Sequence, residues 1–202
     1  MVEEFPNKEN ERMSYNSFAD LVKSEIQGED FDIQIEKRDS QIAFFAPHGG
    51  KIEPGTTEIV HYLAGNEYSF YSFVGKKGSN NFLMHISSNS FDEPQALELA
   101  KSVDRVITIH GMKGNDVEKI TLGGLDKELI LKVKQQLLNV DFPVEIADAD
   151  STLKGVSIEN ICNKGNSGKG LQIEISRMLR QKLVSNEIDL ERFRRAIMNS
   201  IQ

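Results

Sequence analysis

The chain contains 202 residues, of which 39% are apolar and one is cysteine, and its formal net charge is −7. A chain of this size can bury a continuous core, so we expect one domain over residues 15–202, and the single Cys162 excludes an internal disulfide and Cys-rich zinc motifs. The acidic balance argues against nucleic acid or an anionic membrane surface as the main partner, because both need clustered Lys and Arg.

The first half of the chain alternates between helical and extended patterns. Residues 1–14 show no apolar period and are expected to form a flexible tail, whereas residues 14–26 have apolar side chains at helical spacing. The run 42–46 is apolar without alternation, which is typical of a central strand buried on both faces, and Pro47 with the glycines after it is expected to end that strand. The other elements expected here are strands at 31–38, 68–74 and 82–86 and helices at 56–65 and 91–102.

The same alternation continues toward the C-terminus. Residues 126–139 have the clearest amphipathic helix pattern, and the β-branched run 105–110 predicts a second buried strand. This order of elements predicts an α/β fold, a single-domain α/β/α sandwich around a mixed, largely parallel sheet. Further strands are expected at 117–124, 143–147 and 171–175, and further helices at 177–184 and 189–200.

Polar side chains that follow buried strands are the first candidates for chemistry, because ligands of such sheets bind at the carboxyl ends of the strands. His48 and His110 directly follow the two most apolar strands, and Glu53 follows His48 across a turn that contains two glycines and Pro54. A close pair of ligands on one loop with a distant third is a frequent arrangement of catalytic zinc sites. These three residues are therefore candidate metal ligands; the alternative is that each histidine is a hydrogen-bonded polar residue that caps a strand.

Other possible sites have weaker patterns. Glu58 and His61, three residues apart on one helix, could share a metal, but no partner helix repeats the pair, so a surface contact is the simpler interpretation. Cys162 has no evident base nearby, which disfavours a nucleophilic thiol. The glycine-rich loop 163–170 lacks the spacing of a phosphate-binding loop and precedes a strand, so it does not predict nucleotide binding.

A carboxylate in an otherwise apolar strand is a candidate general base, because desolvation raises its pKa toward neutrality. Glu174 lies in such a run, LQIEI, in phase with Gln172. The alternative is a strand with one polar face. The preceding loop 163–170 has the composition that lets backbone and lysines approach a ligand.

Five segments carry a resemblance to a known family. Together they resemble the phage poly-γ-glutamate hydrolases, whose members also occur in prophage regions, and the resemblance covers roughly residues 40–182 in order. The segments are APHGGKIEPGTTEI (46–59), HISSNSFDEP (85–94), ITIHG (107–111), TLGGLDKEL (121–129) and NICNKGNSGKGLQIEIS (160–176).

This resemblance implies a zinc carboxypeptidase-like fold and hydrolysis of the γ-linked polyglutamate of bacterial capsules. It implies that a single catalytic Zn²⁺ is held by His48, Glu53 and His110, and that Glu174 is the general base. We further expect substrate to bind near Asn163, Lys169 and Arg180, which the resemblance supports only as neighbours of the site. Further cations that could bind substrate carboxylates are Lys51 and Lys113.

We therefore expect a zinc-dependent amidohydrolase that acts on poly-γ-glutamate or on a small γ-glutamyl substrate. The alternatives are a non-catalytic prophage protein that binds a metal or a partner, and an amidohydrolase of a small N-acylated amino acid. The N-terminus lacks the pattern of a secretory signal, which predicts a cytoplasmic location with possible release on host lysis.

The charge distribution is compatible with a polyanionic substrate. Residues 1–40 contain 11 acidic and 5 basic side chains, whereas residues 154–182 contain 6 basic and 2 acidic ones. The acidity therefore belongs mostly to the N-terminal segment, and a small cationic cleft is compatible with the overall charge.

Overall fold

The computed structural model describes residues 15–114 and 116–201, so the expectation of a flexible tail at 1–14 lies outside the described residues. Within these residues the strands form one seven-stranded sheet with the order β1-β3-β2-β4-β7-β5-β6. Only β1–β3 and β5–β7 are antiparallel pairs among these described strands, and the other neighbours are parallel. The strands are β1 (Phe31–Glu36), β2 (Ile42–Gly50), β3 (Ser69–Gly75), β4 (Arg105–Met112), β5 (Ile120–Gly124), β6 (Val144–Ile146) and β7 (Leu171–Ser176).

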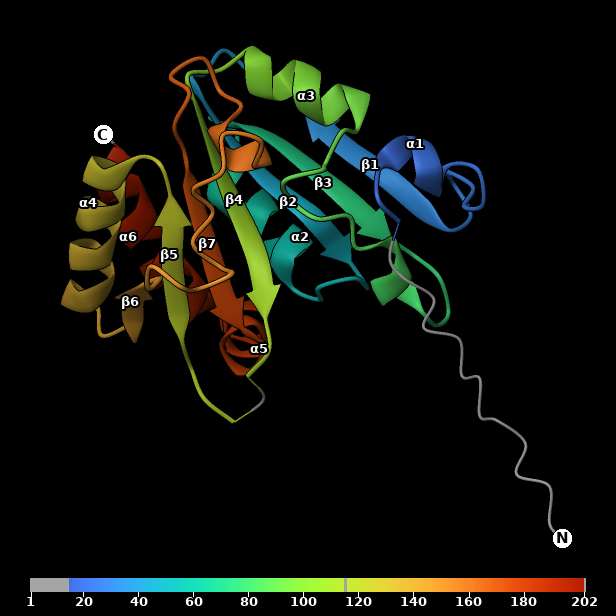
Figure 1. Ribbon diagram of the computed structural model, residues 1–202. Coiled ribbons are helices and arrows are strands. Elements are labelled where there is room, and N and C mark those ends of the chain that lie inside the picture. The colour runs from blue at the N-terminus through green and yellow to red at the C-terminus, as the bar shows by residue number, and fades with distance from the viewer. Residues whose placement is uncertain (1–14, 115, 202) are drawn as a thin grey trace, which may run out of the picture.

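Helices cover both faces of this sheet (Figure 1). One face packs against α2 (Thr56–Ala64), α4 (Lys127–Asn139), α5 (Arg177–Ser185) and α6 (Glu187–Ile201), and the other packs against α1 (Phe18–Leu21) and α3 (Pro94–Lys101). The expectation of an α/β/α sandwich with a mixed, largely parallel sheet is confirmed. Within the described residues, no helix is both long and apolar enough to cross a bilayer.

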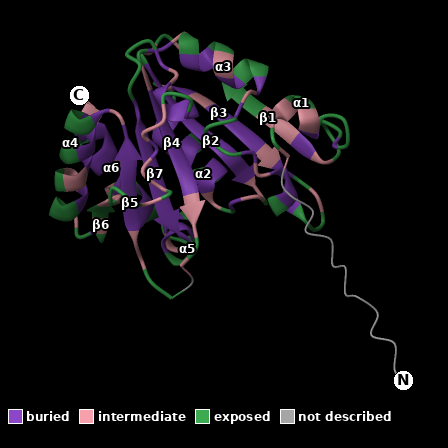
Figure 2. Ribbon diagram, viewed as in Figure 1, coloured by how far each residue is buried: buried purple, intermediate pink, exposed green. Residues whose placement is uncertain are grey.

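The central strands divide the core into two layers because their side chains alternate between the faces. Phe44, Ile107 and Ile173 pack under α2, α4, α5 and α6, whereas Phe45 and Val106 pack on the opposite side with α1 and α3. Figure 2 shows that β2, β4 and β7 are buried along most of their length. These strands therefore form a rigid base for the residues at their carboxyl ends.

The apolar run 82–86 differs from its expected structure. The run 82–86 is not a strand, because residues Asn81–Met84 form a 3₁₀ helix, η1, in which Leu83 and Met84 are buried and Phe82 is 63% exposed. A short apolar run is compatible with either a buried strand or a buried helical turn, and only the packing decides between them. A short first helix was expected within residues 14–26, and α1 confirms it; the helix spans only Phe18–Leu21, because the apolar residues beyond Leu21 are largely exposed.

Strand β2 does not end at Pro47, as its sequence predicted, but continues to Gly50 with an irregularity. Its register against β3 shifts between Ala46 and Gly49, where Pro47 has no N–H group to donate to the ladder. Strict alternation would place His48 on the same face as Ala46, yet the ring of His48 contacts Phe91 on the other face. The bulge thus redirects His48 toward the face that carries His110.

Candidate metal centre

His48 and His110 meet at the carboxyl ends of the neighbouring parallel strands β2 and β4. Their Nδ1 atoms lie 3.2 Å apart, and both residues are almost completely buried. The expectation that these two strand ends bring the imidazoles together is confirmed.

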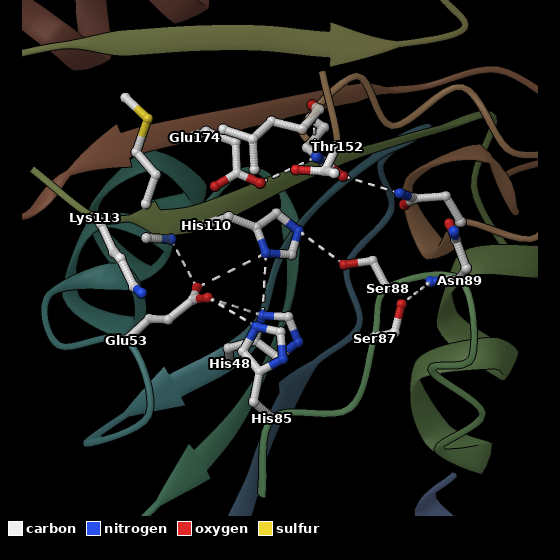
Figure 3. Close-up of a pocket in the computed structure, with 15 residues that line it drawn as sticks. His48, Glu53, His85, Ser87, Ser88, Asn89, His110, Lys113, Thr152 and Glu174 are labelled. Carbon is white, nitrogen blue, oxygen red and sulfur yellow. Dashed lines mark hydrogen bonds and ion pairs between the residues drawn. The ribbon is translucent and has the colours of Figure 1, made fainter. Parts of the chain in front are cut away.

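Glu53 reaches the same point from the turn between β2 and α2. The turn is closed by a hydrogen bond from the Glu53 N–H to the His48 carbonyl, at 2.9 Å. The carboxylate of Glu53 lies 3.2 Å from Nδ1 of His48 and 3.8 Å from Nδ1 of His110 (Figure 3). This turn therefore places an anionic group beside the two imidazole nitrogens.

The three side chains fit a metal ion. One donor atom from each of His48, Glu53 and His110 lies within 4.8 Å of the other two. Ligands about 2.0–2.2 Å from a tetrahedral zinc ion are separated from one another by about 3.3 Å, which is close to the shorter distances seen here. Two imidazole nitrogens and one carboxylate also form a donor set that zinc accepts readily.

The hydrogen-bond partners of these groups direct their lone pairs toward one another. Nε2 of His48 lies 2.6 Å from the carbonyl oxygen of Ile86, which can only accept. This nitrogen therefore carries the hydrogen, and Nδ1 has a lone pair that can bind a metal. The N–H of Gly111 donates to Oε2 of Glu53 at 2.7 Å. These contacts fix both side chains in orientations suited to metal binding.

The charge states also suit a cation. Burial by itself would raise the pKa of Glu53, but His48 and the other nearby imidazoles outweigh it and hold the pKa of this carboxyl well below its usual range. Burial lowers the pKa of His110 to about 3. An anionic carboxylate and a neutral imidazole are the forms that coordinate metals.

Glu174 borders the same cavity from β7. It is the register partner of His110, so both side chains leave the sheet on the same face, and it is 6% exposed. Burial, reinforced by the charge of Glu53, raises the pKa of Glu174 to about 8, although Arg180 acts in the opposite direction. A carboxyl group with this pKa can exchange protons near neutral pH.

An amide chain fixes one oxygen of Glu174. Nε2 of Gln172 donates to Oε1 of Glu174 at 3.1 Å, and the amide oxygen of Gln172 accepts from Nδ2 of Asn160 at 2.9 Å. Oδ1 of Asn160 accepts in turn from the N–H of Cys162 at 3.0 Å. Each amide therefore has a defined orientation, and the donor side of Gln172 faces the carboxylate.

These groups line a cavity of about 620 Å³. Its remaining walls come from two loops, one with Ser87, Ser88 and Asn89 and one with Thr152 and Leu153. Among the described residues, Lys113 is the only Lys or Arg that lines it (Figure 3). The cavity thus combines the candidate metal ligands with hydroxyl and amide groups and one cationic side chain.

His85 also lines the cavity. Its ring stacks on His48, with centroids 3.7 Å apart and planes inclined by 23°, and its Nε2 lies 3.2 Å from Oε1 of Glu53. Its side chain is 44% exposed. The sequence pattern predicted a strand at 82–86, which includes His85. That prediction could not place the imidazole of His85 beside those of His48 and His110.

The structure places Asn163 and Lys169 outside the cavity, contrary to the expectation that they border substrate. The amide of Asn163 bonds to backbone groups, donating to the Gly155 and Ser157 carbonyls and accepting from the N–H groups of Gly170 and Leu125. Lys169 is exposed and precedes β7, so it lies at the amino end of the strand, whereas Glu174 lies toward the carboxyl end. Neither residue lines this cavity.

Arg180 also lies behind the cavity rather than in it. Its guanidinium donates to the carbonyl of Pro54 at 2.9 Å, to that of Met112 at 3.3 Å and to that of Ile175. It packs so closely on Gly111 that a Cβ there would lie 2.5 Å from the guanidinium carbon. Arg180 therefore ties together the backbone segments that carry Glu53, His110 and Glu174.

The other candidates take ordinary structural roles. Lys51 donates to the carbonyls of Lys76 and Lys77, each at 3.1 Å, away from the cavity. The ring of His61 packs on Phe70 with centroids 4.3 Å apart. Burial raises the pKa of the Cys162 thiol to about 12, so this thiol is unreactive.

Comparisons with known proteins agree with this geometry. The sequence model of the poly-γ-glutamate hydrolase family matches residues 15–199. The protein YmaC of Bacillus subtilis strain 168 is 38% identical over 177 residues, which are 87% of this chain and 74% of YmaC. The structure of a bacteriophage poly-γ-glutamate hydrolase superposes with a TM-score of 0.88 at 27% identity, covering 93% of this chain and 96% of the phage chain.

A solved structure of YndL, described as its zinc-free apo form, superposes with a TM-score of 0.86 at 32% identity, covering 93% of this chain and 96% of that one. The match of the family model extends over nearly all of the described residues and includes every side chain of the candidate centre. This chain therefore belongs to the poly-γ-glutamate hydrolase family.

Proposed function

We propose that the protein is a zinc-dependent amidohydrolase that cleaves the γ-glutamyl amide bonds of poly-γ-glutamate. The observation that carries the proposal is the convergence of His48, Glu53 and His110, with donor atoms within 4.8 Å of one another, beside the buried carboxyl of Glu174. Membership of the family supports the substrate, and the zinc-free description of YndL supports the choice of metal.

In this proposal the metal ligands are Nδ1 of His48, Nδ1 of His110 and the carboxylate of Glu53. Before a metal enters, hydrogen bonds orient His48 and Glu53, burial keeps the imidazole of His110 neutral, and the carboxyl of Glu53 is anionic. When bound, zinc supplies a Lewis acid that polarises the scissile carbonyl and lowers the pKa of a water molecule.

Glu174 is the proposed general base. Gln172 holds its Oε1, and its other oxygen makes no hydrogen bond within the described residues, so that oxygen is available to the attacking water. Glu174 takes a proton from this water and later passes it to the nitrogen of the leaving amine. A pKa raised by burial makes the carboxyl suited to both transfers.

Substrate recognition is proposed to depend on Lys113 and the neutral polar walls. Each unit of a γ-linked glutamate polymer has a free α-carboxylate, and Lys113 is the cation that can reach one from the wall of the cavity. The hydroxyls of Ser87 and Thr152 and the amide of Asn89 can bind the amide groups of the chain.

The test is release of short γ-glutamyl oligomers from the polymer by the purified protein, with and without a chelator. We expect activity that requires zinc and is lost in Glu174→Gln, while Glu58→Gln on the exposed part of α2 retains it. If the protein hydrolyses small N-acylated amino acids but not the polymer, the proposed substrate is wrong and these small amides are the substrates. Stoichiometric zinc binding without any hydrolysis would support a non-catalytic binding protein instead.

A further inference from the structure

One short segment contacts each of the three candidate ligands. The segment is His85–Ser88, between η1 and α3. Nε2 of His85 lies 3.2 Å from Oε1 of Glu53, and the carbonyl of Ile86 lies 2.6 Å from Nε2 of His48. The hydroxyl of Ser88 lies 3.4 Å from Nε2 of His110, which is a long hydrogen bond.

The segment is itself anchored to the core. The side chain of Ile86 is fully buried in the layer that contains Phe45 and Phe73. The carbonyl of Ser88 accepts from the N–H of Ile161 at 2.9 Å, and the N–H of His85 donates to the Phe82 carbonyl at 3.1 Å. These contacts at both ends and in the middle give the segment a fixed position relative to β2 and β4.

Such contacts matter to a metal centre because they fix the tautomer and the orientation of the ligands. The partner of the second ring nitrogen decides which nitrogen of a histidine faces the metal, and removal of such partners typically weakens metal binding 10- to 100-fold. From this geometry we propose that His85–Ser88 is the outer shell of the metal centre and sets the affinity with which the chain holds zinc. The inference rests on the proposed function, since it takes the same three residues as ligands.

Within this outer shell His85 acts on two ligands at once. Its Nε2–H donates to the carboxylate of Glu53, and its ring covers the ring of His48. Among the described residues, it is not in the group whose donor atoms converge within 4.8 Å. His85 is therefore assigned as a positioning residue that acts through Glu53 and His48, and not as a ligand.

The segment contains its own control. The hydroxyl of Ser87 accepts from the N–H of Asn89 at 3.4 Å and contacts none of the three ligands, although it is next to Ser88 and lines the same cavity. Ser88→Ala removes the partner of His110, whereas Ser87→Ala removes a hydroxyl of equal size that has no such contact. His85→Phe keeps a ring for stacking on His48 but removes the N–H that Glu53 accepts.

The experiment measures the zinc dissociation constant of each full-length variant by competition with a chromogenic chelator. We expect affinity to fall about 10-fold in Ser88→Ala and at least as much in His85→Phe, to stay within about twofold of wild type in Ser87→Ala, and to be retained in Ser88→Thr. Thermal unfolding of the metal-free variants verifies folding, and His85→Ala replaces His85→Phe if the latter does not fold.

Wild-type zinc affinity in both the Ser88 and the His85 variants would overturn the outer-shell assignment while leaving the ligands in place. A different result identifies failure of the proposed function: if Glu53→Gln and His110→Ala also bind zinc as wild type does, the ligand assignment itself is wrong.

Discussion

His110 on β4 and Glu174 on β7 occupy paired positions of two parallel strands. Neighbouring strands lie about 4.8 Å apart, so backbone hydrogen bonds fix the distance between a candidate metal ligand and the candidate general base. The side chains of this pair face the same cavity, and the hydrophobic layer on the other side of the sheet holds both strands in place.

Replacement of Glu174 by Gln is expected to lower the rate of polymer hydrolysis by about 10²–10⁴-fold, because the amide cannot accept a proton from water. Zinc affinity should change little, since Glu174 is outside the converging group of ligands. The rate is measured with zinc-saturated protein, and Glu58→Gln serves as the control. Full activity in Glu174→Gln would show that another group is the base.

The same substitution is expected to change the pH dependence of stability in the metal-free protein. The pKa of Glu174 is about 8 in the folded state against an ordinary value of 4.5, so the folded state favours the protonated form. The contribution of Glu174 to the free energy of unfolding is fully present below pH 4.5 and is lost as the pH rises through 8. Gln cannot ionise, so Glu174→Gln should be more stable than wild type above pH 8, by up to roughly 5 kcal/mol.

Thermal unfolding at pH 5 and pH 9 in the presence of a chelator measures this effect. The difference in Tm between Glu174→Gln and wild type should be small at pH 5 and large and positive at pH 9. An equal difference at both pH values would mean that the ionisation of Glu174 does not contribute.

Gln172→Met is expected to lower kcat about 10-fold with little change in KM or in zinc affinity. The thioether cannot donate to Oε1 of Glu174, so the carboxylate loses the contact that orients it. Gln135→Met is a suitable control, because Gln135 is exposed on α4, bonds to Asn139 and does not line the cavity. A parallel loss of zinc affinity in Gln172→Met would instead indicate general damage to the site.

Lys113→Met is expected to raise KM for the polymer roughly fivefold, which corresponds to about 1 kcal/mol for one exposed ion pair. The effect should weaken as the salt concentration rises, because exposed charges are screened. Lys51→Met and Lys169→Met should leave KM unchanged, since both lysines lie away from the cavity. An equal increase in KM in all three variants would point to the overall charge of the protein rather than to a site for carboxylates.

Gly49→Ala is expected to destabilise the protein by roughly 1–3 kcal/mol, the usual range for overpacking in a core. A Cβ at this position would lie 2.3 Å from the hydroxyls of both Ser72 and Thr57. Gly78→Ala, at an exposed glycine with nothing within 4 Å of an added Cβ, should have little effect on Tm. Comparable Tm values for the two variants would show that β2 can shift at its bulge.

The convergence of His48, Glu53 and His110 was predictable because it follows from topology. Apolar runs identified β2 and β4, and parallel strands place their carboxyl ends at one edge, so the residues after these runs had to be close. The same rule would have excluded Lys169, which precedes a strand. The prediction that Lys169 lies near the substrate depended on the composition of its loop, and composition does not distinguish the two edges of a sheet.

Other features depend on packing that no periodic pattern records. The bulge at Pro47 decides which face His48 occupies, and sequence alternation alone gives the opposite face. The position of His85 depends on η1, whose short apolar run is equally compatible with a strand. The role of Arg180 depends on the carbonyls of Pro54 and Met112, which lie far away in the sequence, and on that of the nearby Ile175; a basic residue on a helix gives no sign of such partners.

The guanidinium of Arg180 has a consequence for the durability of the proposed metal centre. Because it holds the backbone beside Glu53, His110 and Glu174 through direct hydrogen bonds, the shape of the centre is maintained by the protein itself. If the centre holds zinc as proposed, we expect the protein to stay folded when the ion is lost. A molecule stripped of zinc in a metal-poor environment should recover full activity within the time of metal binding, without refolding.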